Sequence, residues 1–443
     1  MHAMRRFWSG LMCALALFLV VGFVPAAAQG LDVGLVTGND SALPIAVVPM
    51  EYQGSGAKPD TVVADVVRAD LARSGQFRAL PVESMVEHPQ SAADMKYPTW
   101  RLLKQDYVLV GRVRDSGDGG YRVEYELFDI AKQQRILGQA MTGRPGEMRR
   151  VAHEIADQVY EKILGVRGAF DTQIAYVTAV GTGNNIKYSL MVADADGFNP
   201  QSVVNSRESL MSPAWSPDGH KLAYTSFERG NSTIYLQTIG TGAREVLASF
   251  KGINDAPAFS PDGRKLAMTL SKSGHPEIYV MDLASRQLTQ VTNHYSINTE
   301  AAWMPDGNTL LFTSDRGGKP QIYQTTLAGG EPTRVSFQGA YNAHATISFD
   351  GKKIAMAQGG GNVYRIALLD RSSGGAGRWQ MLSPGNLDES PSFAPNASMV
   401  MYSAKEGGRG VLYAVSVDGR VRQRLVLSDG DVREPAWGPF RSR

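Results

Sequence analysis

The sequence predicts a small N-terminal α/β domain followed by an all-β, six-bladed β-propeller that the C-terminal strand closes. Three observations lead to this prediction. A seven-residue phrase recurs at intervals of 44 to 46 residues from residue 213 to the C-terminus. Runs of β-favouring residues follow the copies, and strand-like and helix-like runs alternate before residue 166. Four short strands in a unit of this length are typical of propeller blades, and the alternation is typical of an α/β domain.

The recurring phrase has the chemistry of a hairpin turn. Its clearest copies, at 213–219 and 257–263, end in Ser-Pro-Asp-Gly. Proline suits the second turn position because its φ is fixed, and glycine suits the fourth because φ there can be positive. The copy at 391–397 has Ala397 in place of this glycine, so we expect a different type of turn there. The third residue of the phrase is aromatic or apolar in all six copies: Trp215, Phe259, Trp303, Ile347, Phe393 and Trp437.

Residues 1–28 have the features of a cleaved secretory signal. Arg5 and Arg6 precede an apolar run from Leu11 to Val24, and three alanines follow as a cleavage site. The apolar run is shorter than the roughly twenty residues that span a bilayer. The only cysteine, Cys13, lies within it, so the exported chain has no thiol for a disulfide, a metal site or a nucleophile.

Residues 29–42 are expected to form a flexible, partner-binding segment. Leu31, Val33 and Leu35 alternate as one face of a strand would. An ordinary edge strand or a frayed terminus accounts for this pattern as well as a strand that is lent to the sheet edge of a partner.

Residues 43–166 are predicted to form the α/β domain. Ile45–Met50 reads as a buried strand, and Asp60 is expected to cap a helix that Gly75 ends. A second helix is expected from about Gly146 to Leu164, with apolar residues on one face and Gly165 as its terminator. The remaining elements are three strands, of which the first two form a hairpin: Tyr107–Val113, Tyr121–Ile130 and Arg135–Met141.

Residues 167–443 are assigned to the propeller. The first blade lacks its own phrase, although Ile174–Val177 and Tyr188–Ala193 match the second and third strands of later units. The phrase at 435–440 has no strands after it, so it supplies the missing first strand. Joining the two ends of the propeller in one sheet closes the ring and removes its open edges.

Charge and motifs exclude several functions. Without the two arginines of the signal, 43 basic and 43 acidic residues remain, which gives no electrostatic case for binding nucleic acid or an anionic membrane. His153-Glu154 opens a zincin-like motif, but Asp157 stands where the second histidine is needed, so we expect an exposed polar helix face. No nucleophile elbow, P-loop or dinucleotide-binding fingerprint is present, and the sequence predicts no catalytic residue, metal or cofactor.

The repeat indicates one surface as a candidate binding site. The residues three positions before the aromatic slot should surround one mouth of the central channel, with Glu300 and Glu434 on opposite blades. They vary where the frame repeats, as in a binding face on a rigid scaffold, although solvated loop residues would vary too. These positions are Ser212, Ala256, Glu300, His344, Ser390 and Glu434, and one position earlier stand Met211, Asp255, Thr299, Ala343, Glu389 and Arg433.

The domain order and the closing phrase Pro-Ala-Trp-Gly-Pro-Phe, together with Ile278–Ala284 and Asn298–Glu300, resemble the TolB family of the Tol–Pal system. The resemblance implies a periplasmic, monomeric, non-enzymatic adaptor that supports outer-membrane integrity and constriction at cell division. It implies docking of the lipoprotein Pal at the propeller mouth and of TolA on the N-terminal segment, with other outer-membrane proteins as further partners and no membrane insertion. With the ring positions, the expected Pal-facing residues are Ile253, Asp255, Ala256, Thr299, Glu300, His344, Glu389 and Glu434. The expected TolA-facing residues are Leu31, Val33, Leu35 and Thr37.

Two alternatives stay open. The first is a periplasmic propeller enzyme of the peptidase or lyase type with its site at the channel mouth. Peptidases with this repeat generally add a hydrolase domain with a nucleophile elbow, and no such elbow occurs here. The second is a channel that a metal ion stabilises through Glu300, Glu434 and His344.

Overall fold

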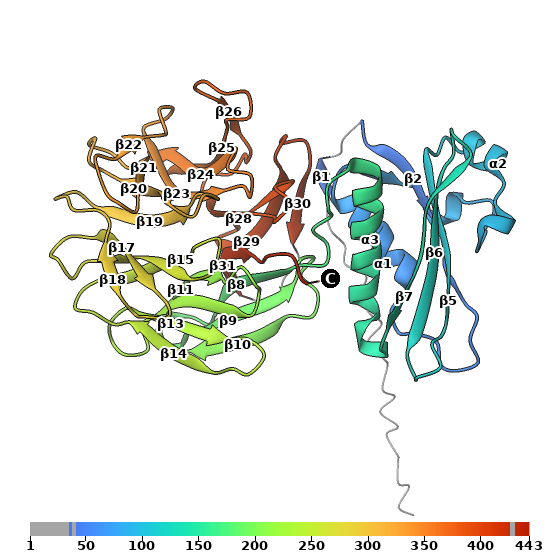
Figure 1. Ribbon diagram of the computed structural model, residues 1–443, viewed down its shortest axis with the longest axis horizontal. Coiled ribbons are helices and arrows are strands. Elements are labelled where there is room, and N and C mark those ends of the chain that lie inside the picture. Colours follow the sequence, from blue (N-terminus) through green and yellow to red (C-terminus); the bar gives the residue numbers. More distant parts are fainter. Residues whose placement is uncertain (1–34, 38–40, 426–429, 443) are drawn as a thin grey trace, which may run out of the picture. The chain divides into compact units, whose positions relative to one another are not determined.

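The computed structural model describes residues 35–37, 41–425 and 430–442 (Figure 1). The predicted signal at 1–28 and two residues of the predicted TolA-facing set, Leu31 and Val33, lie outside the described residues. Within the described part of the chain, no helix is both long and apolar enough to cross a membrane.

The N-terminal domain is built on a mixed sheet in the order β4-β2-β5-β6-β7, with β3 pairing to β5. Strand β2 runs parallel to β4 and β5, whereas β5, β6 and β7 form an antiparallel meander. The strands are β2 (Leu43–Val47), β3 (Glu51–Tyr52), β4 (Phe77–Ala79), β5 (Tyr107–Asp115), β6 (Tyr121–Asp129) and β7 (Gln134–Gly143).

Helices α1 (Val63–Arg73) and α3 (Met148–Leu164) pack against each other and share one apolar core with the sheet, whereas α2 (Tyr97–Leu102) buries Trp100 in a second core. The expected cap at Asp60 is wrong, because α1 begins after Val62 and no side chain caps it. Helix α3 ends as expected, at Gly165 with φ +74°. The described residues also form four 3-10 helices: η1 (Val82–Ser84), η2 (Ala92–Asp94), η3 (Pro145–Glu147) and η4 (Gly183–Asn185).

Six antiparallel sheets form the propeller, which confirms the predicted fold class. Blade one contains β31 (Asp431–Trp437), β8 (Gln173–Val180), β9 (Lys187–Asp194) and β10 (Gln201–Ser206). Blade two contains β11 (Leu210–Trp215), β12 (Lys221–Ser226), β13 (Thr233–Thr238) and β14 (Arg244–Ala248). Blade three contains β15 (Asn254–Phe259), β16 (Lys265–Leu270), β17 (Glu277–Asp282) and β18 (Leu288–Gln290).

The remaining blades follow the same order from the innermost strand outward. Blade four contains β19 (Asn298–Trp303), β20 (Thr309–Ser314), β21 (Gln321–Thr326) and β22 (Thr333–Arg334). Blade five contains β23 (Tyr341–Ile347), β24 (Lys353–Gly360), β25 (Val363–Asp370) and β26 (Arg378–Met381). Blade six contains β27 (Glu389–Phe393), β28 (Met399–Glu406), β29 (Arg409–Ser416) and β30 (Arg422–Leu425).

The C-terminal strand closes the ring as predicted. Strand β31 pairs antiparallel with β8, with Trp437 opposite Ile174. The tryptophans of the repeated phrase also join neighbouring blades, because Trp215 donates its indole N–H to the carbonyl of Ala436 in blade one at 3.0 Å. Trp303 makes the same bond to Ala258 in blade three at 3.0 Å. The large residue in this slot therefore connects blades as well as filling space between them.

The phrase forms one type of turn in its first and fifth copies. The N–H of Gly219 donates to the carbonyl of Ser216 at 2.9 Å, and that of Ala397 donates to Ala394 at 2.8 Å. Ala397 has φ +56°, close to the +72° of Gly219. The expectation of a different turn at Ala397 is therefore wrong: alanine adopts the left-handed conformation that glycine adopts elsewhere.

Strand β1 (Leu35–Thr37) adds a fifth strand to blade six. It pairs antiparallel with β30, with Leu35 opposite Gln423 and Thr37 opposite Arg422. The described part of the predicted partner-binding segment thus lies on a sheet edge of its own chain.

Candidate partner-binding site

The mouth of the central channel is built by a distortion that every blade repeats. Each innermost strand changes its pairing register within the same four-residue stretch, which marks a β-bulge. The bulged residue has a positive φ in all six blades, although none of the six is glycine. Residues other than glycine rarely adopt a positive φ, so its occurrence in all six blades shows that the bulge is a regular structural feature of the propeller. We call these residues the mouth ring: Ser212, Ala256, Glu300, His344, Ser390 and Glu434.

Carboxylates at the mouth connect adjacent blades. Glu300 accepts the backbone N–H of His344 in the next blade at 2.9 Å and the hydroxyl of Thr313 at 2.8 Å. Glu434 in blade one accepts the backbone N–H of Ser212 in blade two. The left-handed backbone of the mouth ring thus presents N–H groups that the acids of neighbouring blades can accept.

A third acid acts in the same way. Asp255 accepts the hydroxyl groups of Ser212 at 3.0 Å and Thr225 at 2.8 Å, both in the preceding blade. These bonds hold the carboxylates in place before any partner arrives, which is the arrangement that a preorganised binding surface requires.

The mouth encloses a polar cavity of about 460 Å³. Four acidic residues line it: Asp255, Glu300, Glu389 and Glu434. The neighbouring Arg433 supplies a single positive charge, so acidic groups predominate at the mouth. Burial raises the pKa of the Glu434 carboxyl above its ordinary value, although the bond from Ser212 opposes this shift. Seven of the eight predicted Pal-facing residues line the cavity: Asp255, Ala256, Thr299, Glu300, His344, Glu389 and Glu434.

The eighth, Ile253, belongs to a group of exposed apolar side chains around the mouth. These residues occupy four consecutive connections, those that lead into β15, β19, β23 and β27. We call them the apolar rim: Ile253, Tyr295, Ile297, Phe337 and Leu387. Phe337 and Tyr295 are 73 % and 78 % exposed, which is unusual for aromatic side chains. Of this group, only Ile253 was predicted from the sequence, where the signal is an apolar residue in an otherwise polar connection between blades.

The residues proposed for a metal-stabilised channel do not converge. Glu300 and Glu434 bond to different neighbouring blades, and the imidazole Nδ1 of His344 lies 3.7 Å from Glu300. Among the described residues, the three are not a group whose ligand atoms lie close enough to share an ion. The geometry therefore gives the metal alternative no support.

A second polar centre lies where the N-terminal domain contacts the propeller, which we call the joint. His153 is only 1 % exposed and is surrounded by charged side chains, so the expectation of an exposed polar helix face is wrong. No local pattern in the sequence indicates this burial, because the partners of His153 come from α1 and from blade one. One of these partners is Asp196, in the turn between β9 and β10.

A small α/β domain followed by a closed six-bladed propeller defines the class of this two-domain protein. Family models for the TolB amino-terminal domain and the TolB β-propeller domain match residues 31–136 and 160–441. The Tol-Pal system protein TolB of Xanthomonas oryzae pv. oryzae (strain KACC10331 / KXO85) is 66 % identical over 431 residues, or 97 % of this chain and 98 % of that one. The crystal structure of TolB from Acinetobacter baumannii, 40 % identical, has a TM-score of 0.84 and covers 93 % of this chain and 100 % of that one. The chain belongs to the TolB family.

Proposed function

We propose that this protein is a periplasmic, non-enzymatic adaptor of the Tol–Pal system. In this proposal the lipoprotein Pal docks on the propeller mouth, and TolA binds the N-terminal segment. Membership of the TolB family and the names of the relatives support a role in the Tol–Pal system. The adaptor would connect two partners in the envelope and so support outer-membrane integrity and constriction at cell division.

The observation that carries the proposal is the apolar rim around a preorganised polar ring. Apolar side chains exposed on four consecutive blade connections favour a protein partner, because such a partner removes them from water. The acids of the mouth already have partners in neighbouring blades, so docking need not reorganise them. An apolar rim and a polar centre together suit a folded partner that inserts a polar loop.

The Pal proposal is tested with two substitutions of equal exposure. Phe337→Asp changes a rim residue that is 73 % exposed, and Val86→Asp changes a residue of the N-terminal domain that is also 73 % exposed. We expect Phe337→Asp to weaken Pal binding at least about tenfold, because an apolar contact with Pal would be replaced by a charge that binding buries. Val86→Asp should leave the affinity unchanged, and neither variant should lower the melting temperature. Calorimetric titration with purified Pal measures this, and full affinity in Phe337→Asp would refute docking at the mouth.

The TolA proposal rests on the strand character of the N-terminal segment. Residues 35–37 already pair as a strand with β30, so this segment can adopt the extended form that β-augmentation of a partner sheet requires. Deleting residues 31–37 should abolish TolA binding while folding and Pal binding persist. Unchanged TolA affinity in the deletion variant would contradict this role.

A further inference from the structure

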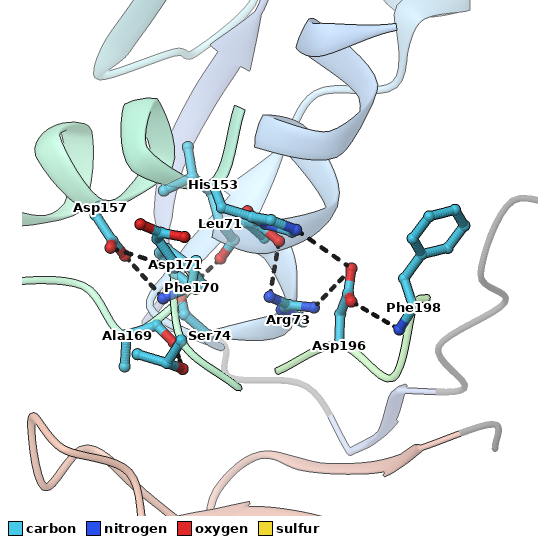
Figure 2. Close-up of polar contacts among 12 residues, drawn as sticks. Leu71, Arg73, Ser74, His153, Asp157, Ala169, Phe170, Asp171, Asp196 and Phe198 are labelled. Carbon is cyan, nitrogen blue, oxygen red and sulfur yellow. Dashed lines mark hydrogen bonds and ion pairs between the residues drawn. The ribbon is translucent and has the colours of Figure 1, made fainter. Parts of the chain in front are cut away.

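Buried charges link the N-terminal domain to the propeller at the joint. Asp70 and Arg73 come from α1, His153 from α3, and Asp196 from the turn between β9 and β10 in blade one. Arg73 bonds to Asp70 at 2.8 Å and reaches Asp196 across the joint at 3.4 Å, and Arg149 of α3 also pairs with Asp196. Figure 2 shows Arg73 pointing toward Asp196, with His153 beside them. All but Arg149 are buried.

Polar contacts matter at this joint because the two domains do not share an apolar core. The core of the N-terminal domain includes only Phe170 from beyond α3, and the adjoining propeller core includes only Ala169 from before β8. Both residues belong to the linker between α3 and β8, residues 165–172. Domains without a large shared apolar interface are expected to move relative to each other. The buried charges are therefore among the contacts that hold the joint closed, together with the bond from the side-chain amide of Gln423 to the carbonyl of Arg73 at 2.9 Å.

The two ring nitrogens of His153 face carboxylates in different domains. Nδ1 lies 2.6 Å from Asp70 in the N-terminal domain. Nε2 lies 3.8 Å from Asp196 in the propeller and has no hydrogen-bond partner among the described residues, although it is fully enclosed. A neutral imidazole donates through one nitrogen only, whereas an imidazolium donates through both.

The protonation state of His153 therefore changes the number of bonds across the joint. In the neutral form, Nδ1–H donates to Asp70, and the lone pair of Nε2 faces an oxygen of Asp196 without a proton between them. In the charged form, Nε2–H faces Asp196 at 3.8 Å, and it donates to that carboxylate once the two groups approach to hydrogen-bond distance. A hydrogen bond between two charged groups is about twice as strong as a neutral one.

Other charged groups face this cluster and bear on its titration. Arg73 and Arg149 balance Asp70 and Asp196. Burial opposes ionisation of Asp70, but Arg73 and His153 hold its pKa below the usual range. Asp157, one turn further along α3, carries a pKa that burial raises to about 7.

We propose that His153 is a proton-operated latch between the two domains. The protonated ring binds Asp70 of the N-terminal domain and Asp196 of the propeller at once, and the neutral ring binds Asp70 alone. The joint is then harder to open at acidic pH than at alkaline pH. The device regulates the relative movement of the domains and is independent of which partners bind at the mouth.

The protonation of His153 can be read directly in the intact protein. Imidazole ¹⁵N spectra of the mature chain, recorded over a series of pH values, should show Nδ1 protonated throughout and Nε2 protonated only at the acidic end of the series. His153→Gln assigns the signal, and the exposed His88 provides a solvent-like reference in the same spectra. An Nε2 that stays protonated, or stays unprotonated, over the whole series would overturn the proposal.

A double-mutant cycle tests the bond across the joint. The four proteins are wild type, His153→Gln, Asp196→Asn and the double variant, and amide hydrogen exchange of residues 168–172, corrected for intrinsic rates, reports opening. We expect a coupling of at least about tenfold at about pH 5.5, as for hydrogen bonds to charged groups, and less than about twofold at about pH 8. The same pH dependence should persist in an Asp157→Asn background, which removes the other titrating group. Equal coupling at both pH values would mean that the contact is merely structural and would refute the latch. If a variant fails to fold, the ¹⁵N spectra of the wild type still show whether Nε2 of His153 gains a proton.

Discussion

The two ends of the propeller's innermost strands use one repeated frame in opposite ways. At the mouth, the mouth ring varies from blade to blade, its acids bond to neighbouring blades, and the cavity remains open. At the other end of these strands, the turn phrase is similar from blade to blade. Its fifth copy differs from the others at Asn396 and Ala397, where the linker before β8 packs against it. There Asn396 donates to the carbonyl of Arg167 in the linker at 3.0 Å, and Ala397 is buried.

This comparison teaches that departures from the repeat mark contacts, but that only the three-dimensional structure tells which partner makes them. Asn396 departs from the aspartate of the other phrases because an amide can donate to a carbonyl and a carboxylate cannot. The mouth ring departs from the repeat without a covering segment among the described residues. We therefore attribute the variation at Asn396 to contact with the protein's own linker, and the proposed function attributes the variation at the mouth to a separate partner.

The largest difference between the mouth and the joint should appear in the unfolding free energy of their variants. Asp70→Ala leaves the buried His153 without the acceptor of its Nδ1 and removes the nearer of the two carboxylates that pair with Arg73, so we expect a loss of about 3–5 kcal/mol in unfolding free energy. Glu300→Ala removes a half-exposed acceptor from His344 and Thr313, and we expect a loss of about 1 kcal/mol. Urea unfolding of both variants measures the contrast. Equal losses would mean that the mouth is as much a structural element as the joint.

A smaller effect should distinguish the joint by its pH dependence. Asp157 accepts the N–H groups of Phe170 at 2.7 Å and Asp171 at 3.3 Å in the linker (Figure 2). Burial raises its pKa from 3.8 to about 7, so between these values the folded protein binds more protons than the unfolded chain. Stability then falls as the pH rises through this window, by up to about 4 kcal/mol.

Asp157→Asn should flatten that part of the profile. Asp388 and Glu434, whose pKa values burial also raises, remain in both proteins, so the difference between the two profiles isolates Asp157. Urea unfolding between about pH 5 and about pH 8.5 provides the profiles. Identical slopes in the two proteins would show that this carboxyl ionises freely in the folded state.

The smallest expected effect concerns the turn that departs from the repeat. Ala397→Gly relieves a left-handed alanine but removes a buried methyl group, so the unfolding free energy should change by less than about 1 kcal/mol. Gly219→Ala introduces a side chain at φ +72°, for which we expect a loss of about 1–2 kcal/mol. Thermal unfolding of both variants tests whether the two turns are equivalent. A large loss in Ala397→Gly would show that its methyl group contributes more to the joint than the turn geometry suggests.

Much of the frame could be predicted because its causes are local. The Ser-Pro-Asp-Gly turns, the aromatic slot and the 44-residue spacing are written within short stretches, and they predicted six blades, the closing strand and the positions of the mouth ring. The cap at Asp60 was wrong for a related reason: capping depends on where the helix starts, and α1 begins after Val62 without a side-chain cap.

The rest depended on residues that are far apart in the sequence. His153 is 83 residues from Asp70, and Asn396 is 229 residues from Arg167, so no local pattern shows that these pairs meet. The apolar rim was missed because each of its members is unremarkable in its own loop. Only the ring arrangement brings them around one opening.

By itself, the sequence determined the closed propeller, its preceding α/β domain and the ring of variable positions, because periodicity and turn chemistry act over a few residues. Only the tertiary structure decided that β1 lies on the edge of blade six, that His153 stands between carboxylates of two domains, and that Ala397 keeps the common turn. These outcomes depend on burial and on long-range pairing, which give a residue its partners after the chain has folded.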